Sequence, residues 1–279
     1  MKNHTEQELR YAPIGVFDSG VGGLTVVREI MRQIPNERIV YFGDTARVPY
    51  GSKSKETIIR FSRQIIRFLE TKNIKALVFA CNTASALALE EIQPELDIPV
   101  IGVLKPGAKV AAEVTQNGKI GVIATESTIA SQLYTKVINS HNPRAQVLGK
   151  ACPLFVPLVE EGWLKDPVTI EVANRYLEPL LESGIDTLIM GCTHYPLLRS
   201  TLGEIMGDKV NLVNPAYETA RELKIMLSEA GLDNDGRETA EGNIHQFYVS
   251  DAADKFKNFA NSILPYGVDT TQLIHIEEY

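Results

Sequence analysis

The sequence has few cysteines and lacks the features of an exported or membrane-bound chain. Only three cysteines occur in 279 residues, at positions 81, 152 and 192. An odd number of widely spaced cysteines does not fit a disulfide framework. The first residues, "MKNHTEQELRYAP", lack the apolar core of a signal peptide, and no run approaches the ~18 apolar residues that span a bilayer. We therefore expect a cytoplasmic protein with free thiols and no membrane partner.

The sequence also lacks basic patches and the usual cofactor motifs. The net charge of −7 and the pI near 5.4 give no support for a nucleic-acid partner. The segment "DSGVGGLT" matches neither the dinucleotide-binding nor the P-loop glycine pattern, so a phosphate cradle there is unsupported. No G-x-S-x-G elbow occurs, and the cysteines lack the paired spacing of a zinc site. Lys105, in "VLKPG", is interpreted as a loop charge rather than a Schiff-base lysine.

What the chain does contain is an alternation of short β-rich runs with amphipathic helical patterns. The runs are nearly continuous in valine, isoleucine and leucine, as strands covered on both faces should be. The alternation predicts an α/β fold with parallel sheets and right-handed crossovers. Strands are predicted at 13–19, 38–44, 75–80, 98–103, 119–125, 186–191 and 210–214, and helices at 23–34, 54–72, 126–140, 166–183 and 216–232.

Two segments, "KALVFACNTASALALEEI" and "DTLIMGCTHYPLLRSTLGEI", follow one plan. Each has an apolar strand, a cysteine, two polar residues and a leucine-rich helix, and the cysteines are 192 − 81 = 111 positions apart. Internal duplication explains the similarity, and so does common α/β architecture. Either way, two halves that each present a thiol at a strand end could face one another across a cleft.

A cysteine between a strand and a helix has a reason to be reactive. Backbone N–H groups and the positive end of the helix dipole favour the thiolate, so we predict a lowered pKa for Cys81 and Cys192. Pro196 suits a first helical turn, and Asn82 and Thr193 could cap a helix or hold a carboxylate. Buried cysteine is also a common small hydrophobe, and we prefer that interpretation for Cys152, which lacks the strand-then-helix pattern.

Ligands of open α/β sheets bind beyond the carboxyl ends of the strands. Polar or small clusters follow several of the predicted strands, and they mark the expected site: Asp18-Ser19-Gly20, Gly43-Asp44-Thr45, Cys81-Asn82-Thr83, Thr125 and Cys192-Thr193-His194.

Several separated blocks resemble glutamate racemases of the aspartate/glutamate racemase family. They are "GVFDSGVGGLTV", "GDTARVPYG", "ACNTASA", "KIGVIAT" and "LIMGCTHYPLL", in this order, within residues 14 to 230 or so. The resemblance implies two similar doubly wound α/β domains with the active site in the cleft between them, and a homodimer. It also implies a cofactor- and metal-independent racemase that interconverts L- and D-glutamate and supplies D-glutamate for peptidoglycan.

The resemblance also assigns residues. Cys81 and Cys192 match the catalytic pair, with Asp18 and His194 assisting proton movement and Glu160 supporting His194 from behind. One thiol must begin as thiolate and the other as thiol, on opposite faces of the α-carbon. The implied substrate-binding residues are Asp18, Ser19, Pro49, Tyr50, Gly51, Asn82, Thr83, Thr125, Thr193 and His194.

Some alternatives stay open. The substrate could be aspartate, with the same fold and mechanism, or the chain could be a non-catalytic amino-acid-binding protein. Asp18 could serve only as a helix cap, His194 could be a loop histidine, and Tyr50 could only pack a turn. The short N-terminal stretch argues against activation by a peptidoglycan precursor.

The tail "NIHQFYVSDAADKFKNFANSIL" predicts a strand and helix that return to the first domain, which gives domains of 1–104 plus 214–279 and of 105–213.

Overall fold

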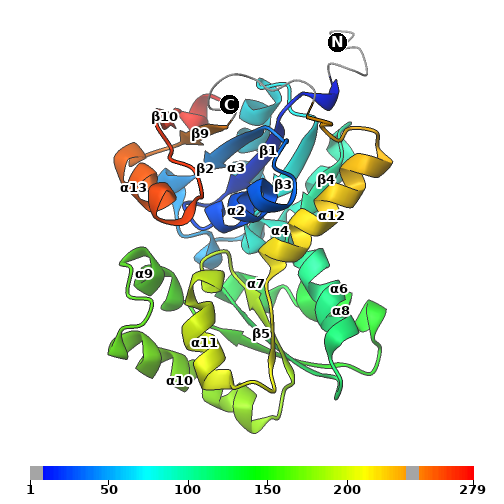
Figure 1. Ribbon diagram of the computed structural model, residues 1–279, viewed down its shortest axis with the longest axis vertical. Helices are drawn as coiled ribbons and strands as arrows, with labels where there is room; N and C mark the ends of the chain where they lie inside the picture. Colours follow the sequence, from blue (N-terminus) through cyan, green and yellow to red (C-terminus); the bar gives the residue numbers. More distant parts are fainter. Residues whose placement is uncertain (1–8, 237–244) are drawn as a thin grey trace.

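The computed structural model describes residues 9–236 and 245–279. Two sheets form two halves of the molecule, one above the other in Figure 1. All the registered strand pairs in both sheets are parallel. The predicted α/β fold with two parallel-sheet units is confirmed. The proposed domain limits near residues 104 and 214 stay a prediction.

The first half has a six-stranded sheet of order β10-β9-β2-β1-β3-β4. Its strands are β1 (Ile14–Asp18), β2 (Ile39–Gly43), β3 (Ala76–Phe79), β4 (Val100–Gly102), β9 (Gln246–Val249) and β10 (Gln272–Leu273). Alternate residues of β1 face opposite layers: Ile14 and Val16 join one buried cluster, and Phe17 joins the other. Both faces are therefore covered, which explains why the strands read as continuous apolar runs.

Helices of the first half cover its sheet on the two faces. α2 (Leu24–Gln33), α12 (Pro215–Glu229) and α13 (Ala253–Ile263) pack on one face, and α3 (Lys55–Glu70), α4 (Asn82–Leu87) and α5 (Leu89–Ile92) pack on the other. The short 3₁₀ segments η1 (Thr45–Arg47), η2 (Tyr50–Ser52), η3 (Gln93–Glu95) and η5 (Ile276–Glu278) complete it. The tail returns to this sheet, because β9 pairs with β2. Residues 243–244 of the predicted tail strand lie outside the described residues.

The second half has a four-stranded sheet of order β6-β5-β7-β8. Its strands are β5 (Lys119–Ala124), β6 (Gln146–Ala151), β7 (Thr187–Gly191) and β8 (Asn211–Val213). α6 (Leu104–Val114) and α8 (Leu133–His141) cover one face, and α9 (Phe155–Glu160), α10 (Pro167–Glu182) and α11 (Arg199–Met206) cover the other. α7 (Glu126–Ala130) and η4 (Tyr195–Leu198) follow β5 and β7.

The strand order repeats between the halves. β2-β1-β3-β4 in the first sheet has the same pattern as β6-β5-β7-β8 in the second. Cys81 follows β3 and Cys192 follows β7, so each cysteine comes after the third strand of its unit. This repeat favours internal duplication over chance similarity of two short segments.

The structure differs from the expectations in several elements. The helix predicted over 126–140 is broken into α7 and α8, because Gln132 takes a left-handed conformation with φ 55°. Strand β6 and helices α6 and α9 were not expected, and Lys105 lies in the first turn of α6 rather than in a loop. β6 is a half-exposed edge strand, so it lacks the continuous apolar run that marks the central strands. No helix among the described residues is both long and apolar enough to cross a bilayer.

Candidate active site

Cys81 lies at the carboxyl end of β3 and begins helix α4. Its sulfur accepts a hydrogen bond from the Ala84 backbone N–H (3.5 Å) and donates to the Ser19 hydroxyl (3.7 Å). The sulfur itself caps the helix, whereas Asn82 was one of the residues expected to cap it. The predicted lowering of the Cys81 pKa is wrong: burial, followed by the charge of Asp18, raises the pKa of the Cys81 thiol to about 12. Burial outweighs the helix terminus, so Cys81 is held as a neutral thiol.

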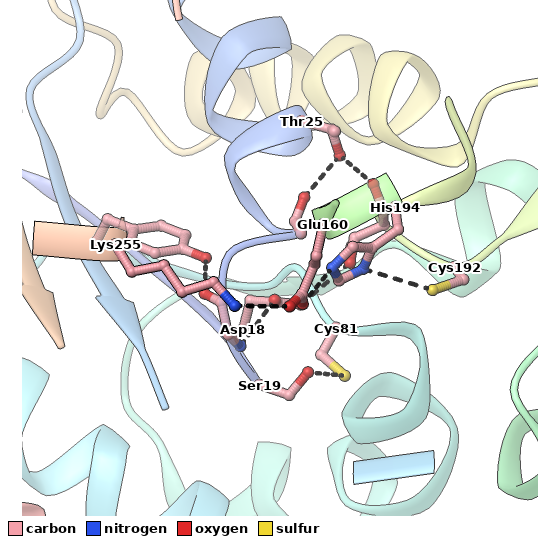
Figure 2. A network of polar contacts seen from close by, with 12 residues as sticks. Asp18, Ser19, Thr25, Cys81, Glu160, Cys192, His194 and Lys255 are labelled. Atoms are coloured by element: carbon pink, nitrogen blue, oxygen red, sulfur yellow. Dashed lines mark hydrogen bonds and ion pairs between the residues drawn. The ribbon is translucent and has the colours of Figure 1, made fainter. Parts of the chain in front are cut away.

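Cys192 lies at the matching end of β7, ahead of the 3₁₀ segment that contains Pro196. Its sulfur is 3.9 Å from Nδ1 of His194, and Nε2 of the same ring is 3.1 Å from Oε1 of Glu160. Figure 2 shows this chain of contacts, with Cys81 and Ser19 close by. Cys192 thus has an ionisable partner in the position where Cys81 has a hydroxyl.

His194 carries the positive charge in this series of contacts. Burial opposes its protonation, but the hydrogen bonds to Cys192 and Glu160 outweigh burial and raise the pKa of His194 to about 10. The hydrogen bond from His194 lowers the pKa of Glu160, so that carboxyl is ionised at neutral pH. His194 is therefore an imidazolium at neutral pH, placed between a carboxylate and the Cys192 sulfur.

Asp18, at the end of β1, joins the two cysteine environments. Its fully buried carboxylate accepts from the Gly20 backbone N–H (3.0 Å) and from the Thr193 hydroxyl (3.4 Å), and also from the Gly23 backbone. Burial raises the pKa of Asp18 from its usual value, and the charge of His194 opposes that rise. Asp18 does receive backbone hydrogen bonds ahead of α2, but its contacts also extend to the other half of the molecule.

The two halves meet tightly around this carboxylate. The hydroxyl of Thr25, in α2, donates to the Thr193 carbonyl across the interface (2.9 Å). A Cβ placed on Gly22 would lie 2.3 Å from Oγ1 of Thr193 and 2.5 Å from Nδ1 of His194. Glycine is therefore required at position 22 for this close approach.

A second set of contacts crosses between the halves beside Cys81. The Tyr134 hydroxyl, from α8, donates to Oδ1 of Asn82 (2.7 Å). The hydroxyls of Thr83, Thr125 and Thr128 lie within 2.9 to 3.2 Å of one another. Three hydroxyls from two elements in different halves can redirect their hydrogen bonds toward a ligand carboxylate.

The loop 49–51 lies against the same elements. The Gly51 carbonyl accepts from the Ser127 hydroxyl (2.7 Å), and a Cβ on Gly51 would lie 2.7 Å from the Thr125 side chain. Tyr50 is buried, and its hydroxyl donates to the Asp44 carboxylate. Pro49 is exposed and precedes η2. Among these three residues, Gly51 makes the direct contact with the opposite half.

Four residues of these contacts were not singled out from the sequence: Thr25, Thr128, Tyr134 and Lys255. Asp44 belongs to a strand-end cluster that the sequence marked, and it accepts from Arg47 (2.8 Å) and from the Ser250 hydroxyl (2.9 Å). The contacts of Thr25, Tyr134 and Lys255 join the two halves, so they are found only in the folded structure.

Cys152 lies outside this network. It is fully buried in the core of the second half, and its thiol donates to the Lys150 carbonyl (3.6 Å). Burial raises the pKa of the Cys152 thiol to about 12. These contacts agree with a packing role. Across residues 9–236 and 245–279, no group of three or more His, Cys, Asp and Glu side chains is arranged to hold a metal ion.

Comparison with known proteins places this fold and site in a class. The profile of the Asp/Glu/Hydantoin racemase family matches residues 14–223. The chain is 53% identical over 251 residues to a glutamate racemase from Geobacter metallireducens, covering 90% of this chain and 92% of that protein. The chain therefore belongs to the Asp/Glu/hydantoin racemase family, and it has two buried cysteines at matched strand ends of a two-sheet α/β fold. It is therefore an enzyme of the isomerase class.

Within the family, the structural similarity is to glutamate racemases. A crystal structure of a glutamate racemase isoform from Bacillus anthracis superposes with a TM-score of 0.90 at 41% identity, covering 95% of this chain and 98% of that one. The structure from Francisella tularensis in complex with D-glutamate gives a TM-score of 0.89 at 38% identity, covering 97% of this chain and 100% of that one.

Proposed function

We propose that this racemase interconverts L- and D-glutamate by transferring protons between two cysteines and the α-carbon, without a cofactor. The observation that carries the proposal is the pair of buried sulfurs at matched strand ends in opposing halves, Cys81 being 5% and Cys192 7% exposed. The two are electrostatically coupled, since negative charge on Cys192 raises the pKa of Cys81. The relatives that match most of the chain are named for glutamate.

One thiolate and one thiol are enough to balance the protons and electron pairs of the reaction. A thiolate on one face takes the α-proton and becomes a thiol, and the electron pair of the C–H bond stays on the α-carbon and its carboxylate. The thiol on the other face then gives its proton to the α-carbon and becomes a thiolate. The enantiomer has formed, and the enzyme has exchanged its acid and base, ready for the reverse direction.

The two cysteines differ in their surroundings. Cys81 is the acid, because burial and the neighbouring Asp18 charge favour its protonated form. Cys192 is placed to act as the base, because its sulfur faces the His194 imidazolium, itself held by Glu160. The resting enzyme first reacts with the enantiomer whose α-proton faces Cys192.

The transition state requires positive or hydrogen-bonding groups where charge grows on the α-carboxylate. Hydroxyls of Thr83, Thr125 and Thr193, the Asn82 amide and nearby backbone N–H groups supply them. Ser19 and loop 49–51 would complete the substrate contacts. Both sulfurs are almost inaccessible in this structure, so glutamate enters when the two halves separate and reacts when they close.

The decisive test is an assay of the purified enzyme by circular dichroism with both enantiomers of glutamate and of aspartate, without added cofactor. The proposal predicts turnover of both glutamate enantiomers and a preference for glutamate over aspartate. A preference for aspartate would overturn the substrate. Binding of glutamate without turnover would instead identify a non-catalytic amino-acid-binding protein.

Other parts of the proposal concern the setting of the reaction. We infer a cytoplasmic enzyme, since both thiols must stay reduced, and a product that serves peptidoglycan synthesis. We infer domains near 1–104 plus 214–279 and near 105–213.

We also infer a homodimer, for which the half-exposed Trp163 and Val168 are candidate interface side chains (47% and 50% exposed). A monomer mass by light scattering at the working concentration would contradict the inferred homodimer.

A further inference from the structure

An ion pair links the two halves behind the catalytic histidine. Nζ of Lys255, in α13 of the first half, lies 3.7 Å from Oε2 of Glu160, at the end of α9 in the second half. The other oxygen of Glu160 contacts Nε2 of His194 (3.1 Å). Figure 2 shows Lys255, Glu160, His194 and Cys192 as one chain of contacts, and Figure 1 shows α13 and α9 on the same side of the molecule.

Helix α13 contacts the second half through a further side chain. Phe259, one turn along from Lys255, packs against both the first-half core of α2 and α12 and the second-half core that contains Phe155 and Tyr195. Lys255 and Phe259 are four residues apart, so they lie on neighbouring positions of one helix face. This face therefore meets the second half with an apolar contact and a charged one.

We propose that Lys255 is a positioning residue that couples closure of the two halves to the alignment of Glu160 and His194. The proposal rests on the two-cysteine function, because His194 matters only as the partner of Cys192. The Lys255–Glu160 contact exists only while the halves are together, so it favours the closed enzyme. In the same state it holds Glu160 in the position where it contacts His194. The charged groups around the imidazolium are then Glu160, Cys192 and Asp18, with Lys255 beyond Glu160.

The size of the effect is limited by solvent. The Lys255 side chain is 68% exposed and that of Glu160 is 29% exposed, and exposed pairs of this kind change equilibria by about 1.4- to 5-fold. Such a contact cannot hold the enzyme closed alone. It shifts the balance between open and closed forms, and salt weakens it.

Chemical labelling of the cysteines tests the proposal without requiring turnover. The rate of alkylation of each thiol by iodoacetamide is measured by mass spectrometry in wild type, K255M, K255E, K255R and K257M. K257M removes the same charge from the same helix, but Lys257 contacts the Asp269 carbonyl rather than Glu160. Cys152, fully buried in the second-half core, reports unfolding rather than opening.

We expect K255M to speed labelling of both Cys81 and Cys192 by about 1.4- to 5-fold, and K255E by more, since it places a carboxylate against Glu160. K255R and K257M should match wild type, Cys152 should not change, and salt should reduce the K255E effect. In both reaction directions kcat/KM should fall by the same factor in K255M, because the enantiomers have equal free energies.

The outcomes distinguish failure of the Lys255 proposal from failure of the proposed glutamate racemisation. Equal labelling and equal kcat/KM in K255M and K257M would overturn the role of Lys255 and leave glutamate racemisation intact. Faster labelling of Cys152 in step with the other two would also overturn it, because the variant would then be unfolding. The expected labelling pattern in an enzyme that does not racemise glutamate would support the contact and refute the proposed function.

Discussion

Nδ1 of His194 lies 3.9 Å from the Cys192 sulfur, whereas the Cys81 thiol donates to the Ser19 hydroxyl (3.7 Å). Two cysteines in matched strand-end positions thus have different partners. In the proposed mechanism, a symmetrical reaction is carried out by an asymmetrical pair, in which one cysteine contacts an imidazolium and the other contacts a hydroxyl. In that mechanism, this asymmetry makes Cys192 the first base and Cys81 the first acid.

Replacing His194 by asparagine should change the pH dependence on the alkaline side. Because the pKa of His194 is raised to about 10, the wild-type imidazolium is present below that pH and is lost as the pH rises through it. Wild-type kcat/KM should therefore fall near pH 10. In H194N that decline should be absent, and the next one should follow ionisation of Cys81 near pH 12. Loss of the assisting group should lower kcat by about 10²- to 10⁴-fold.

The pH profile of kcat/KM in both directions is the measurement for H194N. His141, exposed at the end of α8, provides the matched control H141N, which should keep the wild-type profile. An alkaline decline that stays near pH 10 in H194N would assign it to another group and contradict the imidazolium beside Cys192.

Adding one methyl group at Gly22 should prevent the halves from closing. The new Cβ would lie 2.3 Å from Oγ1 of Thr193 and 2.5 Å from Nδ1 of His194, well inside contact distance. A misplacement of the catalytic groups by about 1 Å costs on the order of 10²-fold, and we expect a fall of that size in kcat/KM for G22A. The control is G203A, whose Cβ would meet Leu212 at an ordinary 3.7 Å. Wild-type kinetics in G22A would show that this close approach is not needed for turnover.

A buried ion pair lies at the end of β3 opposite Cys81, and we expect it to affect the stability of the fold strongly. Nζ of Lys75 lies 2.5 Å from Oε2 of Glu37, and it also donates to the carbonyls of Arg10 (2.6 Å) and Leu232 (2.8 Å). K75M leaves the buried Glu37 carboxylate without its cation, so the free energy of unfolding should fall by about 3–5 kcal/mol. Urea unfolding measures this loss. The double variant K75M/E37L, which removes both charges, should recover much of it, and a double variant less stable than K75M would contradict this explanation.

The positions of the candidate site residues at the strand ends could be predicted from the sequence. Asp18, Cys81 and Cys192 each follow an apolar run, and parallel strands present their carboxyl ends on one edge, so their position follows from the pattern alone. The same rule marks Asp44, but its contact with the Tyr50 hydroxyl depends on the tertiary fold. Glu160 came from the resemblance, and the structure places it 3.1 Å from His194.

Contacts that depend on how the two halves meet could not be predicted. Thr25, Tyr134 and Lys255 lie on helices whose patterns show only which face is buried, not which residue of the other half they reach. The Cys81 pKa was predicted in the wrong direction for a related reason. A strand–helix junction shows the helix terminus in the sequence, but the burial of Cys81 and the charge of Asp18, at the end of the neighbouring strand β1, depend on the tertiary fold.

The single-cysteine variants test the central claim most directly. C81S, C192S and the control C152S are incubated with each glutamate enantiomer in deuterium oxide, and racemisation and deuterium at the α-carbon are followed separately. Two opposed thiols predict that C81S and C192S each lose racemisation, that any remaining exchange is confined to a different enantiomer in each, and that C152S still turns over. Racemisation that survives in either C81S or C192S would contradict the two-cysteine account.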